Sequence, residues 1–358
     1  MSGTITQFIP YGEVHGRNIL TTTALDLFAG HGWGVAMEKI GVKEHSVDIM
    51  PEVRETRFAN GMADLVYENV WDVHHADVLE FNTLIASPPC QGFSMAGSGT
   101  GRKALNDVVG LIHAKAYKSV DSLREQGEIL GDERTALVLA PLHYIEKYNP
   151  EYIALEQVPS VQPVWNVYAD VLAEQGYHVW TGVLQSEQYG VPQTRKRSIL
   201  LARKSSAIGV PVPTNSAYNN QNPYALDAGM PSWVSIKDAL GEIKIEATGK
   251  TATHFKLGKQ KNQAIRAVDT PSMTLAFGND YMSPRWASTY QDALDWSFKP
   301  EQKLTDRLER LSVEQAAVLQ SYPAGFTFGG NKFHQFKQIA NSVPPAMAEL
   351  ILRHLWEA

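Results

Sequence analysis

Cysteine is nearly absent from this chain of 358 residues, because Cys90 stands alone. One thiol cannot form an internal disulfide framework or a multi-cysteine zinc site, so we expect no disulfide and no bound metal. A chain of this length can bury a large core without such cross-links. The scarcity of cysteine also fits a reducing compartment, and we therefore expect a cytoplasmic protein.

Long apolar runs are missing as well. No stretch of 18 apolar residues occurs, so we expect no membrane span, and the first twenty residues lack the apolar segment of a secretory signal. Basic charge is also in short supply, since 32 Lys and Arg face 38 Asp and Glu for a net charge of −6. The global charge therefore does not indicate nucleic-acid binding, and such a site would need a local basic patch.

Short apolar runs alternate with helical stretches between Thr23 and Arg203. The runs that read as strands are residues 24–28, 45–49, 83–87, 152–156, 178–184 and 197–203. The last two are close enough in sequence to form an antiparallel pair. Strands separated by helices predict an α/β fold with a doubly wound, mainly parallel sheet. Ligands bind beyond the carboxyl ends of such strands, and Asp48, Cys90 and Glu156 all lie at or just past these ends.

The composition changes after Arg203. Residues 210–233 are rich in Pro, Asn and Ser, which predicts an irregular segment. Residues 244–266 hold six basic side chains and one acid, a local balance of +5 in an acidic protein. Helical character returns past Leu311, where Ser312 is a plausible helix N-cap. The last fifteen residues form an amphipathic helical pattern that starts after a proline pair.

A glycine-rich turn, FAGHGWG at 28–34, follows the first predicted strand, and Asp48 lies 18 residues beyond Gly30. Glycines allow a backbone to approach a ligand, and an acid at the end of the second strand commonly accepts hydrogen bonds from ribose hydroxyls. Together they favour an adenosine-containing cofactor, whereas the turn alone is compatible with a plain strand-to-helix connection. Asp77 fits either a place near the adenine or a solvated turn.

Three further segments carry candidate chemistry. SPPCQGFS at 87–94 places Cys90 among Pro, Gln, Gly and Ser, a poor core context that favours a nucleophile over a buried thiol. Glu156 ends an apolar strand, so it either pairs with a basic residue or faces a site. Gln193, Arg195 and Arg197 alternate and would share one face of a strand, which is either the edge of a charged cleft or a solvated edge.

The ordered set ALDLFAGHGWG, SPPCQGFS, LEQVPS, QTRKRSILL, RLSVEQAAVLQSYP and QIANSVPPAMAELI resembles the DNA (cytosine-5)-methyltransferase family. The blocks run in the family's order from residue 24 to the C-terminus. The resemblance implies the fold of S-adenosylmethionine-dependent methyltransferases with a small target-recognition domain. It implies a catalytic domain at 1–203, a recognition domain at 204–310 and a segment at 311–358 that returns to the catalytic domain.

The resemblance also implies S-adenosylmethionine as methyl donor and S-adenosylhomocysteine as product. The thiolate of Cys90 would add to C6 of a flipped cytosine, Glu156 would contact N3 and the exocyclic amine, and Arg195 would stabilise charge at O2. Gln91 and Arg197 complete the expected catalytic set. The expected donor contacts are Phe28, Gly30, Gly32, Asp48, Asp77, Pro88, Asn341 and Val343.

Double-stranded DNA is the expected partner, bound by a monomeric enzyme of the restriction–modification or phage type in a bacterial or phage-infected cell. The expected DNA contacts are Ser94, Gln193, Lys256, Lys259, Lys261 and Arg266. A charge cluster such as 244–266 is otherwise often a solvated face.

Two residues depart from the family pattern: Gln157 replaces the usual asparagine after the glutamate, and Ala340 replaces the usual glycine before Asn341. These departures leave open a relative that transfers a modified group. A tRNA cytosine-5 methyltransferase would share every catalytic block and is a second alternative. A catalytically silent DNA-binding protein is the third, disfavoured because Cys90, Glu156 and Arg195 are all present.

Overall fold

A seven-stranded sheet forms the centre of the computed structural model, which describes residues 22–62, 65–75, 80–89, 99–129, 136–246, 248–256, 265–275, 297–300 and 309–357. The strand order is β3-β2-β1-β4-β5-β8-β6. The strands are β1 (Thr23–Leu27), β2 (Lys43–Val47), β3 (Leu65–Tyr67), β4 (Thr83–Ala86), β5 (Tyr152–Gln157), β6 (His178–Gln185) and β8 (Lys196–Arg203). Only β8 runs against its neighbours, so the predicted mainly parallel sheet and the antiparallel β6–β8 pair are confirmed.

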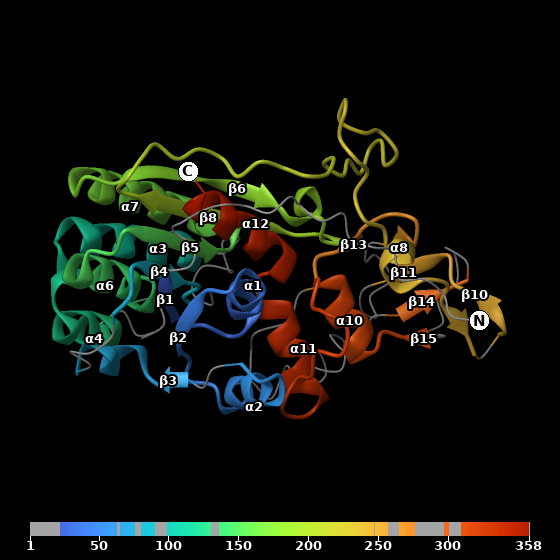
Figure 1. Ribbon diagram of the computed structural model, residues 1–358, viewed down its shortest axis with the longest axis horizontal. Helices are drawn as coiled ribbons and strands as arrows, with labels where there is room; N and C mark the ends of the chain where they lie inside the picture. Colours follow the sequence, from blue (N-terminus) through green and yellow to red (C-terminus); the bar gives the residue numbers. More distant parts are fainter. Residues whose placement is uncertain are drawn as a thin grey trace.

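Helices cover both faces of this sheet (Figure 1). Side chains alternate along the strands, so that Ala24 and Ile199 face one layer while Leu25 and Leu200 face the other. The first layer contains α1 (Gly32–Ile40) and α12 (Pro345–Trp356). The second contains α3 (Gly99–His113), α4 (Val120–Ile129), α6 (Ala140–Tyr148) and α7 (Gln162–Glu174). This two-sided burial explains why the strand sequences read as continuous apolar runs.

The segment between Gly99 and Ile129 belongs to the second layer. Val108, Ile112, Tyr117 and Leu123 are buried in the same core cluster as the strands β1, β4 and β5. The apolar side of this segment therefore supports the sheet from one face.

A second, smaller region has a core of its own. Its four-stranded sheet has the order β12-β11-β14-β15, beside a β9–β10 pair. The elements are α8 (Ile236–Leu240), β9 (Lys244–Ile245), β10 (Lys250–Thr251), β11 (His254–Lys256), β12 (Ile265–Ala267), β14 (Ser297–Lys299), β15 (Glu309–Arg310), α10 (Val313–Leu319) and α11 (Lys332–Asn341). Phe255, Phe298 and Phe336 pack together in this core. Helices α10 and α11 thus belong to the second core, and α12 alone returns to the main sheet.

Short elements connect the two regions. Strand β7 (Gln193–Thr194) pairs with β13 (Ser272–Met273). The other short elements lie within the main region: α2 (Pro51–Ala59), η2 (Val70–His75), η3 (Ala116–Lys118), η4 (Pro159–Val161) and η5 (Ser186–Tyr189).

Ser312 caps α10 as predicted, because its Oγ accepts a hydrogen bond from the backbone N–H of Gln315.

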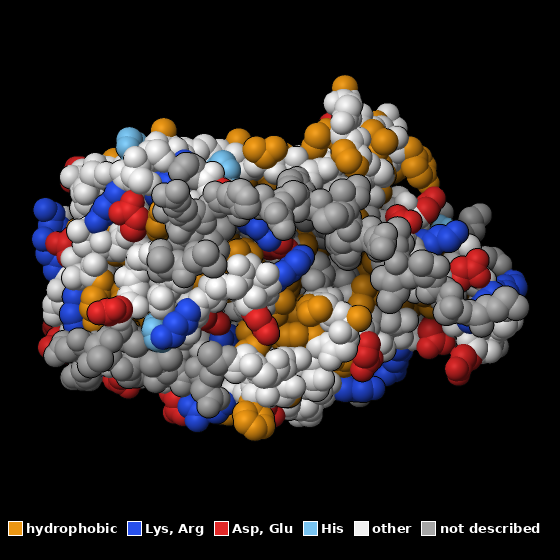
Figure 2. Space-filling view, viewed as in Figure 1, with side chains coloured by type: hydrophobic (Ala, Val, Ile, Leu, Met, Phe, Trp, Pro, Cys, Tyr) orange, Lys and Arg blue, Asp and Glu red, His pale blue; other side chains and the backbone are white. Residues whose placement is uncertain are grey.

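Residues 210–233 contain neither helix nor strand, as predicted. Part of this segment stands out from the rest of the molecule (Figure 1). The segment exposes apolar side chains, among them Val212, Tyr224 and Leu226, and Figure 2 shows apolar side chains on the protruding part. Within the described residues, no helix has both the length and the apolar character needed to cross a membrane. The same residues contain no cluster of three or more His, Cys, Asp or Glu suited to a metal ion.

Candidate functional site

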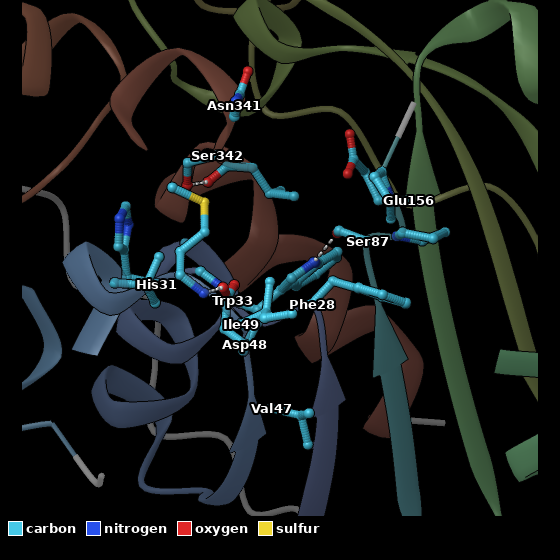
Figure 3. A pocket seen from close by; sticks show the side chains of 18 of the residues that line it. Phe28, His31, Trp33, Val47, Asp48, Ile49, Ser87, Glu156, Asn341 and Ser342 are labelled. Atoms are coloured by element: carbon cyan, nitrogen blue, oxygen red, sulfur yellow. Dashed lines mark hydrogen bonds between the residues drawn. The ribbon is translucent and has the colours of Figure 1, made fainter. Parts of the chain in front are cut away.

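A pocket of about 520 Å³ opens where the chain reverses its winding direction, between β1 and β4. Crevices at such switch points are the usual ligand sites of doubly wound sheets. Segments from both regions line it, namely residues 28–33, 47–50, 68–71, 87–89, 156–158 and, from the end of α11 onward, 337–338 and 341–343. Figure 3 shows Glu156 and His31 on opposite sides of this pocket.

The turn after β1, residues 28–34, is held in an unusual backbone conformation. Phe28 has φ +59° and Gly30 has φ +48°, a region that is costly for a bulky residue such as Phe28. Two charged side chains fix the peptide groups of Gly30. Asp48 Oδ2 accepts a hydrogen bond from Gly30 N at 2.9 Å, and the buried Arg57 donates one to Gly30 O at 3.0 Å. We call residues 28–34 the glycine turn.

Asp48 lies on the pocket wall just past β2. Its Oδ1 also accepts a hydrogen bond, from the backbone N–H of Met50 at 2.8 Å. Burial raises the pKa of this carboxyl above its ordinary value, and the two backbone N–H groups oppose that rise. A carboxylate oxygen has more than one lone pair, so both oxygens of Asp48 can still accept hydrogen bonds from ligand hydroxyls. Phe28 and Trp71 add aromatic surface to the same pocket.

Gly32 has a different function from Gly30. A Cβ atom at Gly32 would overlap the carbonyl oxygen of Val343 and Oγ of Ser342. The glycine is therefore required by the close approach of Ser342 and Val343. These two residues belong to the segment 338–343, which we call the closing block. Four of its members, Gln338, Asn341, Ser342 and Val343, line the pocket.

Glu156 at the end of β5 is buried and paired. Its Oε1 lies 2.7 Å from Nε of Arg197, and both side chains line the pocket. Next to it, Gln157 donates a hydrogen bond from Nε2 to the carbonyl oxygen of Pro88. The longer glutamine thus reaches the Pro88–Pro89 segment, which follows β4 and immediately precedes Cys90. Glu156 is thus paired with a basic residue and also faces the pocket, so the two interpretations of this residue do not exclude each other.

Arg195, two residues before Arg197, has different surroundings. It is buried and donates hydrogen bonds to the carbonyl oxygens of Leu275 at 3.1 Å and Ala340 at 2.7 Å. Gln193 is buried beside it and donates to Oε1 of Gln320 at 2.7 Å. We call Gln193, Arg195 and Gln320 the junction cluster, because they join the main sheet to the second region and the closing block.

The expectation that Gln193, Arg195 and Arg197 share one face along a charged cleft is wrong. The strand is interrupted at Arg195, between β7 and β8. Beyond this interruption, Arg197 reaches Glu156, whereas the two earlier side chains bind neutral groups of the junction.

Comparison with known proteins places this chain in a family. The sequence matches the family described as C-5 cytosine-specific DNA methylase over residues 22–117 and 122–357. The chain belongs to this family. The family resemblance expected from the six sequence blocks is therefore confirmed, and methyl transfer to C5 of cytosine is the reaction that its name states.

Relatives of this chain include type II methyltransferases. The chain is 26% identical over 360 residues to "Type II methyltransferase M1.HphI" of Haemophilus parahaemolyticus, covering 93% of this chain and 86% of the relative. It is 24% identical to M.AplI of Arthrospira platensis, covering 92% and 84%. Among solved structures, S. pombe Dnmt2 methyltransferase is similar in fold, with a TM-score of 0.58, 16% identity, and coverage of 93% of this chain and 98% of that one.

The other residues predicted from the sequence fall into three groups. Of the residues predicted as donor contacts, Pro88, Asn341 and Val343 line the pocket together with Phe28, Gly30, Gly32 and Asp48. Lys256 is buried, and Arg266 lies over the ring of Tyr218 at 4.3 Å while donating to Pro271 O. The residues that lie outside the described part of the chain are Asp77, Cys90, Gln91, Ser94, Lys259 and Lys261.

Several pocket residues were not expected from the sequence. Trp33 donates a hydrogen bond to Ser87 Oγ at 3.0 Å, and Lys337 and Trp71 line the pocket. The sequence did contain a feature that could have pointed to His31: it is a polar side chain between two glycines, in a turn where the backbone approaches a ligand. Lys337 and Trp71 had none, since their segments meet the pocket only through the tertiary fold.

Proposed function

We propose that this protein transfers a methyl group from S-adenosylmethionine to C5 of a cytosine flipped out of double-stranded DNA, through a covalent bond between Cys90 and C6. One observation carries the proposal. The Glu156–Arg197 pair, the Asp48 carboxylate and the Pro88–Pro89 segment before Cys90 all line one pocket. A base contact, a ribose acceptor and the approach to a nucleophile are thus combined in one place.

The pocket suits the proposed donor in size and chemistry. Its volume lies within the range of roughly 300–1,000 Å³ that is typical of small-molecule sites. Asp48 would accept the ribose hydroxyls, Phe28 and Trp71 would contact the adenine, and the closing block would complete the wall. S-adenosylmethionine, when bound, supplies an electrophilic methyl group. The chain's own residues must then make C5 of cytosine nucleophilic, because that carbon is electron-poor in the free base.

The proposed chemistry follows from adding the Cys90 thiolate to C6. The new S–C6 bond moves electron density to C5 and places negative charge on N3 and O2. Glu156 would hold N3 and the exocyclic amine, and a proton on N3 would neutralise the charge that develops there. Transfer of the methyl group to C5 leaves S-adenosylhomocysteine behind. Loss of the C5 proton to a base, departure of the thiolate from C6 and return of the N3 proton to Glu156 then restore the aromatic ring and the starting thiolate.

For the charge at O2 we assign Arg197 in preference to Arg195. The guanidinium of Arg197 is already beside Glu156, while both described hydrogen bonds of Arg195 go to backbone carbonyls of the junction. Arg195 would then act indirectly, by fixing Ala340 in the closing block.

DNA contact is assigned to residues 204–310, the part of the second region that precedes α10, as the target-recognition domain. Of its basic side chains, Lys244 and Lys250 are exposed, whereas Lys256 is buried and Arg266 is held by Tyr218 and Pro271. On the face seen in Figure 2, Lys and Arg side chains at this end of the molecule lie beside Asp and Glu side chains. Phosphate contacts therefore fall to a few exposed lysines, with Lys259 and Lys261 as further candidates.

The test is covalent trapping on duplex DNA that carries 5-fluorocytosine in place of cytosine. Fluorine at C5 prevents the loss of a proton, so the enzyme should stay bonded to the DNA in the presence of S-adenosylmethionine. The Cys90→Ser variant is the matched control and should form no stable adduct. Adducts on tRNA but not on duplex DNA would favour the RNA alternative, and mass spectrometry of the product base would reveal a modified group.

A further inference from the structure

His31 occupies the wall of the pocket at a point where the two regions meet. It is the central residue of the glycine turn and is 1% exposed. Its ring contacts Tyr322, Phe326 and Phe328, with centroid distances of 5.4, 5.8 and 5.3 Å. All three aromatic residues come from the segment between α10 and α11. The imidazole is thus inserted from the main region into an aromatic cluster of the second.

Polar contacts on both ring nitrogens fix this imidazole. Gln338 donates from Nε2 to the carbonyl oxygens of Gly329 and His334, which turns its Oε1 toward Nε2 of His31 at 3.3 Å. A neutral ring that donates from Nε2 accepts at Nδ1, and the hydroxyl of Tyr322 lies 2.5 Å from Nδ1. Burial lowers the pKa of His31 to about 3, and the nearby positive charge of Arg57 adds to this effect. The ring is therefore neutral at physiological pH.

The hydroxyl of Tyr322 continues the connection to the closing block. It also lies 2.5 Å from Oγ of Ser342, whose backbone carbonyl accepts a hydrogen bond from Gln320 Nε2 at 2.7 Å. Ser342 and Val343 are the groups that Gly32 must accommodate. A chain of contacts thus runs from His31 through Tyr322 to Ser342 and joins the two walls of the pocket, one on the glycine turn and one on the closing block.

We propose that His31 is a positioning residue that fastens the closing block to the glycine turn through Tyr322 and Ser342, and thereby sets the affinity of the pocket for the methyl donor. The inference rests on the proposed function for the identity of that donor. His31 moves no proton in the reaction. Its contribution is to hold the pocket in the shape that binds the donor, so its loss weakens binding and leaves the chemical step unchanged.

The experiment measures S-adenosylhomocysteine binding to the full chain by calorimetry. The variants are Tyr322→Phe, which removes only the hydroxyl, His31→Leu, and the two combined. Loss of one buried hydrogen bond and the freeing of its partner weakens binding by about three- to thirtyfold. The double variant should bind no more weakly than whichever single variant has the higher Kd, because both substitutions interrupt the same series of hydrogen bonds. The matched control is Phe326→Leu, which trims the same aromatic cluster without a polar atom and should change the Kd by less than about twofold.

A kinetic readout separates positioning from chemistry. In Tyr322→Phe the KM for S-adenosylmethionine should rise by the same factor as the Kd, while kcat at saturating donor stays within about twofold. Unchanged binding in Tyr322→Phe, additive effects in the double variant, or a lower kcat with an unchanged Kd would each overturn the inference. If His31→Leu does not fold, it is replaced by Ser342→Ala, which removes the hydroxyl at the other end of the series of contacts from His31 through Tyr322. Wild-type protein that binds no S-adenosylhomocysteine would instead refute the proposed donor and this inference with it.

Discussion

The pocket and the adjacent junction cluster use the same kinds of side chain for different purposes. In the pocket, Arg197 and Glu156 form a charged pair that faces space for a ligand. In the junction, Arg195 and Gln193 bind backbone carbonyls and an amide that already belong to the protein. The arginines are two residues apart in sequence, so residue type and spacing do not separate a reactive group from a structural one. Their partners do.

The largest effect in this comparison is expected when the carboxylate of Glu156 in the pocket is replaced by an amide. Glu156→Gln keeps the size of the side chain and leaves a hydrogen-bond acceptor for Arg197, but it cannot protonate N3. Turnover on duplex DNA should fall by about 10²–10⁴, measured by transfer of labelled methyl groups. Denaturant unfolding serves as the control and should show an intact fold. Turnover above about one tenth of wild type would contradict a catalytic role for Glu156.

Lysine substitutions at the two arginines should separate junction from pocket. Arg195→Lys keeps the charge but cannot bridge the carbonyls of Leu275 and Ala340 in the same way, so the free energy of unfolding should fall by about 2 kcal/mol. Arg197→Lys is the matched variant, and it should lower turnover more than stability. Urea unfolding and single-turnover rates check both, and the comparison fails if the two variants behave alike.

The burial of His31 between the two regions predicts how the free energy of unfolding changes with pH. Its pKa is about 3 in the folded protein and about 6.5 in an unfolded chain, so below pH 6.5 the unfolded state binds a proton that the folded state does not. This residue should therefore cost about 1.4 kcal/mol of unfolding free energy per pH unit below 6.5. His31→Leu should reduce that slope, measured by urea unfolding between pH 5 and 7.5. Parallel slopes in the two proteins would mean that His31 takes up its proton at the same pH in the folded and unfolded states.

The smallest expected effect concerns two lysines of the second region. Lys250 is exposed and Lys256 is buried, although both lie in one basic stretch. Lys250→Glu should weaken DNA binding and reduce the slope of log K against log salt by about 1. Lys256→Met should leave that slope unchanged and alter stability instead. Fluorescence anisotropy at several salt concentrations measures the slopes, and equal slopes for both variants would remove Lys250 from the DNA contacts.

The main sheet could be read from the sequence because its signals are local. Runs such as 152–156 are apolar throughout since both faces of the strand are covered, and Ser312 stands at the start of its helix where a capping side chain is needed. The carboxyl ends of parallel strands meet at one edge, so Asp48, Cys90 and Glu156 could be expected in one site. Asp48 and Glu156 do line one pocket, together with Pro88, two residues before Cys90 in the sequence. The small strands of the second region are two or three residues long and carry too few residues for a periodic signal.

The sequence by itself determined the family, the winding of the sheet and the edge where a ligand would bind, because strand patterns and glycine turns act over short distances. Only the tertiary structure decided which arginine faces the pocket, which lysine is buried, and that His31 meets Tyr322 across 291 positions of the chain. Such contacts depend on how two separately packed cores are placed against each other. No local pattern encodes that placement, since it results from the summed packing of many residues far apart in sequence.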